Sequence, residues 1–156
     1  MNKVFHFDSP RTHYKCDAAV VWCFDNRFEL LLRKLVKRLG IVYYDPIRIA
    51  GGTKYLASPQ DESERQFVLN QIRISMRLHE TKHVILMLHS DCGAYGGLAA
   101  FAEDPQKEAE HHRVELQRAT SYLLSQNPEL TVTPYFVDFD GVWQFDQESS
   151  DKVQIA

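Results

Sequence analysis

Short runs of consecutive apolar residues alternate along the chain with segments in which apolar residues recur every three or four positions. Residues 18–22 and 84–88 are uninterrupted apolar runs, which is typical of strands buried on both faces of a parallel sheet. After the first run, apolar positions from Phe28 to Leu39 follow helical spacing, and Gly40 stands where a left-handed cap would end the helix. The pattern therefore predicts a strand, a helix and a second buried strand at the centre of the fold.

The segment between these elements carries weaker signals. Residues 41–49 are rich in β-forming residues but are interrupted by Pro46, so a further strand is expected to centre on residues 47–49. Ser58, followed directly by proline, resembles the start of a helix, and residues 67–78 carry a mixed apolar face with good helix formers. A second long helix is therefore expected here.

The C-terminal third predicts a polar helix over residues 106–125. Residues 131–139 then alternate before an Asp140-Gly141 turn and a last short strand. Strands that alternate with helices imply right-handed crossovers and a mostly parallel sheet. The sequence predicts an α/β fold, a single domain over residues 1–156 with a mostly parallel central sheet flanked by helices and a C-terminal hairpin that adds an edge strand.

Composition narrows the class of protein. The 156 residues are 44% apolar and 25% charged, which fits one soluble globular domain. Because no apolar run approaches the length of a bilayer span and the start of the chain lacks a secretory signal, we expect a cytoplasmic protein with no membrane partner. The net charge of -3 and the scattered basic residues give no case for nucleic acid.

Sulfur and imidazole side chains come directly after the two strongest predicted strands. Cys23 follows one strand, and His89 and Cys92 follow the other. Since the carboxyl ends of parallel strands meet at one edge of a sheet, these side chains are expected to lie together. Zinc prefers thiolate and imidazole ligands, and a catalytic site keeps a fourth position open. The sequence predicts one bound zinc ion, with Cys16 left as a buried or loop thiol.

Two alternatives for these residues stay open. His89 can be a loop histidine with ordinary hydrogen bonds, and the cysteines can be small core residues. Cys23 can also act as a thiolate nucleophile without a metal, helped by the N-terminus of the helix that follows it.

Asp25 and Arg27 follow Cys23 at intervals of two residues. An extended stretch would point all three side chains the same way. A guanidinium group that binds both carboxylate oxygens would keep Asp25 ionised and in place beside the metal. The alternative is an ordinary pair at the N-terminus of the following helix, with Asp25 as its cap.

Three segments together resemble the β-class carbonic anhydrases. Residues 23–27, Cys-Phe-Asp-Asn-Arg, and residues 89–93, His-Ser-Asp-Cys-Gly, resemble the Cys-x-Asp-x-Arg and His-x-Asp-Cys-Gly motifs of that family. Residues 47–52, Ile-Arg-Ile-Ala-Gly-Gly, are similar to its Arg-Asn-Ala-Gly segment. The resemblance covers about residues 15–100, and the hairpin over residues 135–145 resembles the last strands of the family more loosely.

This resemblance implies an enzyme, a carbonate dehydratase of the lyase class that hydrates carbon dioxide reversibly to bicarbonate and a proton through zinc-bound hydroxide. It makes Cys23, His89 and Cys92 the ligands of one zinc ion per chain, and Asp25 with Arg27 the pair that orients the hydroxide. In one group of members the aspartate can swing onto the metal, so Asp25 is also a possible fourth ligand in a closed state. A homodimer or a dimer of dimers is implied as well.

The chain departs from the family pattern at several positions near the motifs. Ile49 replaces an asparagine, Asn26 replaces a small residue, and the bulky Phe28 follows the arginine of the first motif. The plant-type glutamine before the first strand is missing, so the match is closest to the short members that lack it. Phe24, Phe28 and Tyr95, near the expected ligands, are predicted to fill the core or an interface.

These departures leave two rival functions. One is a related zinc hydrolase that acts on carbon disulfide or carbonyl sulfide, because a few residues around the pocket could redirect the chemistry. The other is a non-catalytic zinc-binding member of the family with an assembly or regulatory role.

Further titratable residues are expected at the surface. Glu108, His112 and Glu115 share a face of the polar helix and could hold a second metal, but a solvated charged face is expected. Six histidines are candidate proton carriers, and each is expected to be solvated: His6, His13, His79, His83, His111 and His112.

Overall fold

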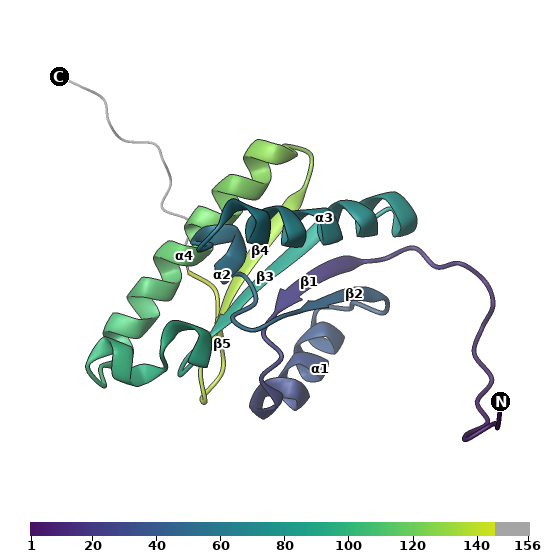
Figure 1. The fold of residues 1–156 in the computed structure, drawn as a ribbon, viewed down its shortest axis with the longest axis horizontal. Coiled ribbons are helices and arrows are strands. Elements are labelled where there is room, and N and C mark those ends of the chain that lie inside the picture. The colour runs from purple at the N-terminus through teal and green to yellow at the C-terminus, as the bar shows by residue number, and fades with distance from the viewer. Residues whose placement is uncertain (146–156) are drawn as a thin grey trace.

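The chain folds around a mostly parallel five-stranded sheet, seen in a computed structural model that describes residues 1–145 (Figure 1). The strands are β1 (Ala18–Trp22), β2 (Tyr44–Arg48), β3 (His83–His89), β4 (Thr131–Val137) and β5 (Val142–Trp143). Their order is β2-β1-β3-β4-β5, and only β5 runs antiparallel to its neighbour. The predicted α/β architecture with a C-terminal hairpin is confirmed.

Helices cover both faces of this sheet. The α-helices are α1 (Glu29–Arg38), α2 (Lys54–Ala57), α3 (Glu62–His79) and α4 (Pro105–Gln126). Three short 3-10 helices are η1 (Asn26–Phe28), η2 (Gly93–Tyr95) and η3 (Leu98–Phe101). Helix α1 packs on one face, and α2, α3 and α4 pack on the other (Figure 1). No described helix combines the length and the apolar character needed to cross a membrane.

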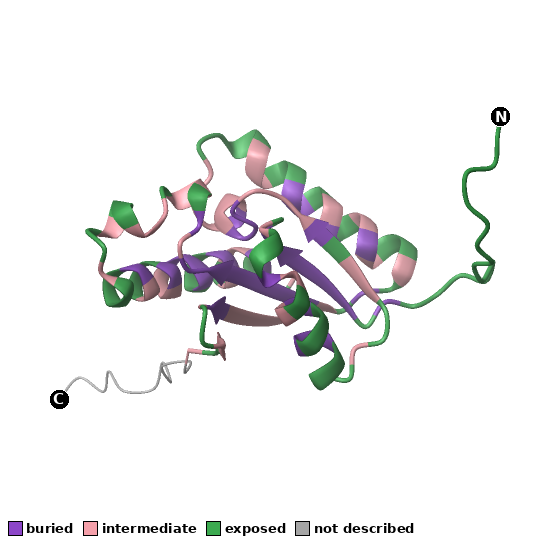
Figure 2. Cartoon of the chain, turned by 90° about the horizontal axis from the view of Figure 1, so that it is seen from below, coloured by how far each residue is buried: buried purple, intermediate pink, exposed green. Residues whose placement is uncertain are grey.

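Both faces of the central strands are buried. On β1, Val20 and Trp22 pack with α1, whereas Ala19 and Val21 pack with the layer of α3 and α4. This is why the run is apolar throughout rather than alternating. Figure 2 shows the central strands in the buried class while the outer faces of the helices are exposed.

Strand β2 begins earlier than the sequence predicted, and it includes Pro46. The prediction that Pro46 interrupts the strand was wrong because β2 lies at the edge of the sheet. Ile49, just after the strand, donates its N–H to the Trp22 carbonyl of β1. Since successive residues of a strand present their N–H groups on opposite sides, the nitrogen of Pro46 faces the open edge, where no donor is needed.

The start of the second long helix was also predicted too early. Helix α3 begins at Glu62, where the Asp61 side chain accepts the Ser63 N–H at 2.8 Å. The short helix α2, which the sequence did not predict, ends just before Ser58. The predicted helices that became α1 and α4 are confirmed, and Gly40 has the left-handed conformation, with φ of 71°.

Candidate metal centre

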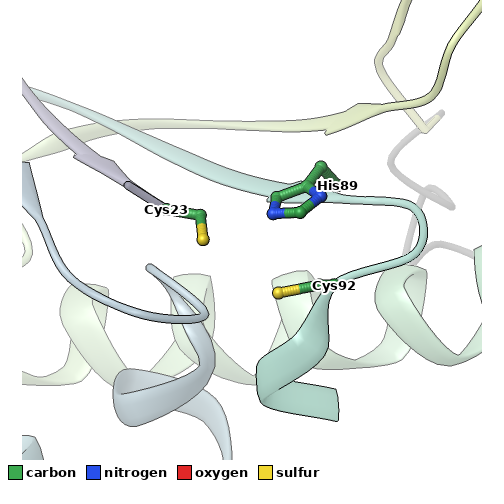
Figure 3. A group of neighbouring side chains, drawn as sticks. All are labelled: Cys23, His89 and Cys92. Atoms are coloured by element: carbon green, nitrogen blue, oxygen red, sulfur yellow. The ribbon is translucent and has the colours of Figure 1, made fainter. Parts of the chain in front are cut away.

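Three buried side chains converge beyond the carboxyl ends of β1 and β3 (Figure 3). Cys23 directly follows β1, His89 is the last residue of β3, and Cys92 lies three residues later. Their ligating atoms all lie within 4.8 Å of one another, and each residue is at most 5% exposed. The three predicted ligands are thus brought together. They form the one such group of three or more that the structure records among residues 1–145.

The imidazole of His89 is oriented for coordination. Its Nδ1 lies 2.8 Å from the Ser90 carbonyl, an acceptor, so Nδ1 carries the proton and Nε2 keeps a free lone pair. Nε2 is buried and has no hydrogen-bond partner. The rings of Trp22 and Phe28 pack beside the imidazole, with centroids 5.4 and 4.9 Å away. An unpartnered buried nitrogen next to two cysteines is what a metal site requires.

The two thiols share one environment and behave as a pair. The neighbouring Cys92 thiol lowers the pKa of Cys23 to about 4, and the Gly51 N–H also approaches the Cys23 sulfur at 3.4 Å. The hydrogen bond between the two thiols, together with burial, in turn raises the pKa of Cys92. One thiolate is therefore available without a metal, and a cation would favour the second as well. This donor set of two sulfurs and one imidazole nitrogen could hold a metal ion.

A pair of glycines lets a third segment approach the site. Gly52 has φ of 49°, and a Cβ built on it would lie 2.8 Å from the backbone nitrogen of Cys23 and 2.8 Å from the carbonyl carbon of Trp22. Gly51, with φ of 71°, faces Ala94 equally closely. Only glycine fits both the conformation and the space at these positions. The loop after β2 therefore closes against the end of β1.

Asp25 is both a helix cap and the partner of Arg27. Its Oδ1 accepts the backbone N–H of Arg27 at 2.9 Å and caps η1. Its Oδ1 and Oδ2 also accept hydrogen bonds from the guanidinium group, the shortest at 2.7 Å. This contact lowers the pKa of Asp25 to about 2, so the carboxylate stays ionised. The two alternatives from the sequence, a cap and a paired carboxylate, are both present.

Arg27 joins the ends of the two central strands. Besides Asp25, it donates to the Asp91 carboxylate at 2.8 Å and to the Asp91 carbonyl at 3.0 Å. The ring of Phe139, in the turn between β4 and β5, lies 5.4 Å from the guanidinium carbon. The sequence did not indicate Phe139, because no motif or spacing links it to the first strand.

Asp25 also lies near the unpartnered nitrogen of the cluster. Its Oδ2 is 4.0 Å from His89 Nε2. Arg27 thus holds the carboxylate near this nitrogen of the cluster.

The positions that depart from the family pattern lie around this centre. Phe28 is buried against His89, so it fills the core as predicted, and Tyr95 packs against the core as well. Phe24 is exposed, so it does not fill the core of this chain, and its other predicted place, in an interface, stays a prediction. Ile49 packs against the core between the sheet and α3.

The polar face of α4 is buried, which contradicts the prediction of a solvated face. Glu108, His112 and Glu115 are each at most 1% exposed, because α4 packs this face against the loops that follow β3 and α2. Glu108 accepts the Asp91 N–H at 2.7 Å, and Glu115 accepts the hydroxyl of Tyr95 at 3.2 Å. Glu108 therefore contacts the loop between His89 and Cys92 (the metal loop), whereas Glu115 contacts Tyr95, which lies beyond that loop.

The predicted surface histidines divide into two groups. His6, His13 and His111 are exposed as expected. His79 is partly buried and bonded to Asp45, His83 is partly buried and bonded to Thr133, and His112 is fully buried. The surface prediction was wrong for these three because each lies where its helix or strand meets a neighbouring element. The remaining thiol, Cys16, is buried as expected.

Residues 13–147 match the model of a family described as "Putative carbonic anhydrase". An uncharacterized protein of Rickettsia bellii is 27% identical over 147 residues, covering 90% of each chain. An uncharacterized protein of Rickettsia conorii is 25% identical over 135 residues, covering 85% of this chain and 73% of the relative.

Solved structures with the same fold include several carbonic anhydrases. That of Streptococcus mutans has a TM-score of 0.59 at 18% identity, covering 89% of this chain and 88% of that one. A β-carbonic anhydrase of Trichomonas vaginalis has a TM-score of 0.57 at 11% identity, covering 89% and 87%. One of two tetrameric β-carbonic anhydrases from Sordaria macrospora has a TM-score of 0.52 at 17% identity, covering 86% and 82%.

The close contact of Gly52 with the backbone at the end of β1 predicts that one added methyl group would destabilise the fold. Gly52→Ala should lower the free energy of unfolding by more than about 1 kcal/mol and weaken metal binding, because the methyl group meets the backbone of Trp22 and Cys23. Chemical denaturation and metal titration would measure the two effects. Gly141→Ala, whose added carbon meets no atom within 4 Å, is the control and should change neither. Equal behaviour of the two variants would contradict the tight fit.

Proposed function

The chain belongs to the carbonic anhydrase family and has the β-class fold, and on this premise we propose that it is a zinc enzyme that hydrates carbon dioxide reversibly to bicarbonate and a proton. The observation that carries the proposal is the buried group of Cys23, His89 and Cys92 with the ionised Asp25 beside it. Two thiolates and one imidazole are the ligands that zinc prefers, and three protein ligands leave a fourth position for chemistry.

Cys23, His89 and Cys92 would hold one zinc ion per chain. Zinc bound there would supply a hydroxide nucleophile near neutral pH, because a metal ion lowers the pKa of water. Two thiolates donate more negative charge than two imidazoles, so this site needs a compensating positive charge. Arg27 would contribute positive charge there, although its ion pairs with Asp25 and Asp91 balance that charge.

The chain's own contribution to turnover would come from Asp25 and Arg27. The ionised Asp25 would accept a hydrogen bond from the O–H of the nucleophile and so aim the nucleophile's lone pair at carbon dioxide. Arg27 keeps the carboxylate in that position and ionised. Released from Arg27, Asp25 could reach the metal and close the site, since its oxygen is 4.0 Å from His89 Nε2. The proton that water loses when it becomes hydroxide would leave to solvent.

An oligomer belongs to the same proposal. The Sordaria macrospora proteins of this fold are tetrameric, and this chain exposes large apolar side chains on its N-terminal segment and on α1, including Phe5, Phe7, Leu30 and Leu39. These support a homodimer or a dimer of dimers. Light scattering after size exclusion gives the mass directly, and a monomer at micromolar concentration would contradict the assignment.

Metal content tests the ligand set. Protein purified without chelator should carry close to one zinc per chain, and Cys92→Ser should lose most of it, because a metal site is lost with one of its three ligands. Elemental analysis measures the zinc. Cys16→Ser is the matched control, since Cys16 is also buried but lies outside the cluster and donates to the Ala18 carbonyl.

Less than about half an equivalent of zinc in the parent protein, unchanged in Cys92→Ser, would overturn the ligand assignment. Such a result would favour Cys23 as a thiolate nucleophile that works without a metal.

Stopped-flow hydration assays test the reaction. The zinc-loaded protein should hydrate carbon dioxide, faster at pH 9 than at pH 7, because deprotonation of water at the metal is favoured at higher pH. Rates on carbonyl sulfide and carbon disulfide, measured on the same preparation, separate the related hydrolases. No hydration at either pH would defeat the carbon dioxide activity, and zinc binding without turnover on any of the three substrates would indicate an assembly or regulatory role.

Arg27→Ala separates metal binding from turnover. The variant should keep its zinc but lose about 10²-fold or more in kcat, because Asp25 would no longer be held beside the open position. Arg33→Ala removes a nearby arginine that, within residues 1–145, pairs with Glu29 in an exposed contact, and its activity should match the parent. If Arg27→Ala loses zinc as well, the Asp25–Arg27 pair serves to build the site.

A further inference from the structure

We propose that Glu108, on the buried face of α4, is a positioning residue for the candidate metal centre. Its carboxyl group fixes the turn between His89 and Cys92 and, through Asp91 and Arg27, keeps Asp25 in place. The part of this inference that concerns turnover rests on the proposed carbonic anhydrase activity. The part that concerns metal coordination does not.

The contact itself is buried and specific. Glu108 Oε1 accepts the backbone N–H of Asp91 at 2.7 Å, and Glu108 is 1% exposed. A carboxyl group removed from water is costly unless it is hydrogen-bonded. Among residues 1–145, the Asp91 amide is the hydrogen-bond donor that the structure gives to Glu108. The carboxyl group therefore makes its hydrogen bond to the metal loop and not to α4 or to solvent.

The amide that Glu108 holds belongs to the strained residue of the loop. Asp91 has φ of 52°, a left-handed conformation that costs free energy in a residue other than glycine. This conformation turns the chain between His89 and Cys92, so it sets how the two ligands face each other. A strained turn persists only where its surroundings hold it, and Glu108 is the side chain that holds this one from behind.

Asp91 also links Glu108 to Arg27 and Asp25, on the other side of the site. The Asp91 carboxylate accepts Arg27 at 2.8 Å through one oxygen and the Leu98 N–H at 3.1 Å through the other. Arg27 in turn binds both oxygens of Asp25. A displacement of Asp91 would therefore move the guanidinium group and the carboxylate that stands beside His89.

His112 gives Glu108 no alternative partner. It lies one helical turn further along α4, with its Nε2 3.8 Å from Glu108 Oε1, beyond hydrogen-bond distance. Both of its ring nitrogens are buried without a partner. Burial lowers the pKa of His112 to about 3, so the imidazole is neutral and adds no charge to the pair. The hydrogen bond to Asp91 is thus the one that an experiment can remove.

The loss of the Glu108 side chain should be tolerated by the fold. A cavity of about 250 Å³ lies between the metal loop and the turn after β4, and Glu108 is on its wall together with Ser90 and Phe136. In Glu108→Ala, water from this cavity could bind the freed Asp91 N–H. The variant should therefore fold with a loosened metal loop, which is the state that the test requires.

The test compares Glu108→Ala with Glu108→Gln, whose amide oxygen can still accept the Asp91 N–H. In the cobalt-substituted protein, Glu108→Ala should change the visible d–d spectrum in the same direction as Arg27→Ala, since both free Asp25. It should also lose about 10- to 100-fold in kcat or metal affinity, as outer partners of metal ligands do. Glu108→Gln should restore the parent spectrum and most of the rate.

Glu115→Ala is the matched control. Glu115 is equally buried on the same face of α4, but it contacts Ser58 and Tyr95 rather than Asp91. This variant should lower the melting temperature and leave the cobalt spectrum unchanged. A general disturbance of the α4 core would change the spectrum in both alanine variants and would overturn the assignment.

Two further results would overturn it. One is an unchanged cobalt spectrum and metal affinity in Glu108→Ala. The other is a Glu108→Gln variant as impaired as Glu108→Ala, which would mean that the hydrogen-bond acceptor is not what matters. The spectrum needs no turnover, so these outcomes stay distinct from a failure of the proposed activity, which would appear as absent hydration in the parent protein.

Discussion

Three ligating atoms share one buried corner of this molecule, and one of them, His89 Nε2, has no hydrogen-bond partner. Burial of an unpartnered nitrogen beside two thiols costs free energy that the protein recovers only if something binds there. The site lies where β1 meets β3, at the point of the sheet where the strand order reverses. The surrounding elements serve to keep these atoms together against that cost.

Two kinds of restraint keep the three ligating atoms and their neighbours in place. The backbone sets the ligands, since Gly52 lets the loop after β2 press against the start of Cys23. Polar side chains keep the Asp25 carboxylate beside the cluster, since Arg27 bonds to both Asp25 and Asp91 and Glu108 accepts a hydrogen bond from Asp91. The first restraint concerns whether an ion can bind. In the proposed enzyme, the second would concern whether a fourth position stays available for a nucleophile.

The cluster could be predicted from the sequence because Cys23 and His89 directly follow apolar runs typical of buried strands, Cys92 lies three residues after His89, and parallel strands end at one edge. Glu108 could not. Charged residues at helical spacing look the same whether they face water or a polar loop, and the partner of Glu108 is the backbone amide of Asp91, which carries no sequence signal. Phe139 and Pro46 were missed for a similar reason, since a ring over Arg27 and an edge strand are both set by tertiary arrangement.

Ile49 shows why a departure from the family pattern near the site leaves the metal frame intact. Its backbone N–H still donates to the Trp22 carbonyl at 3.1 Å, and its carbonyl accepts the Gly52 N–H at 3.0 Å. Its side chain packs against the core instead of contributing an amide group. The loop is therefore shaped by backbone bonds and by the glycine, and not by a polar side chain at position 49. In the proposed enzyme, metal binding and turnover would then depend on different groups, the first on the buried cluster of Cys23, His89 and Cys92 and the second on Asp25.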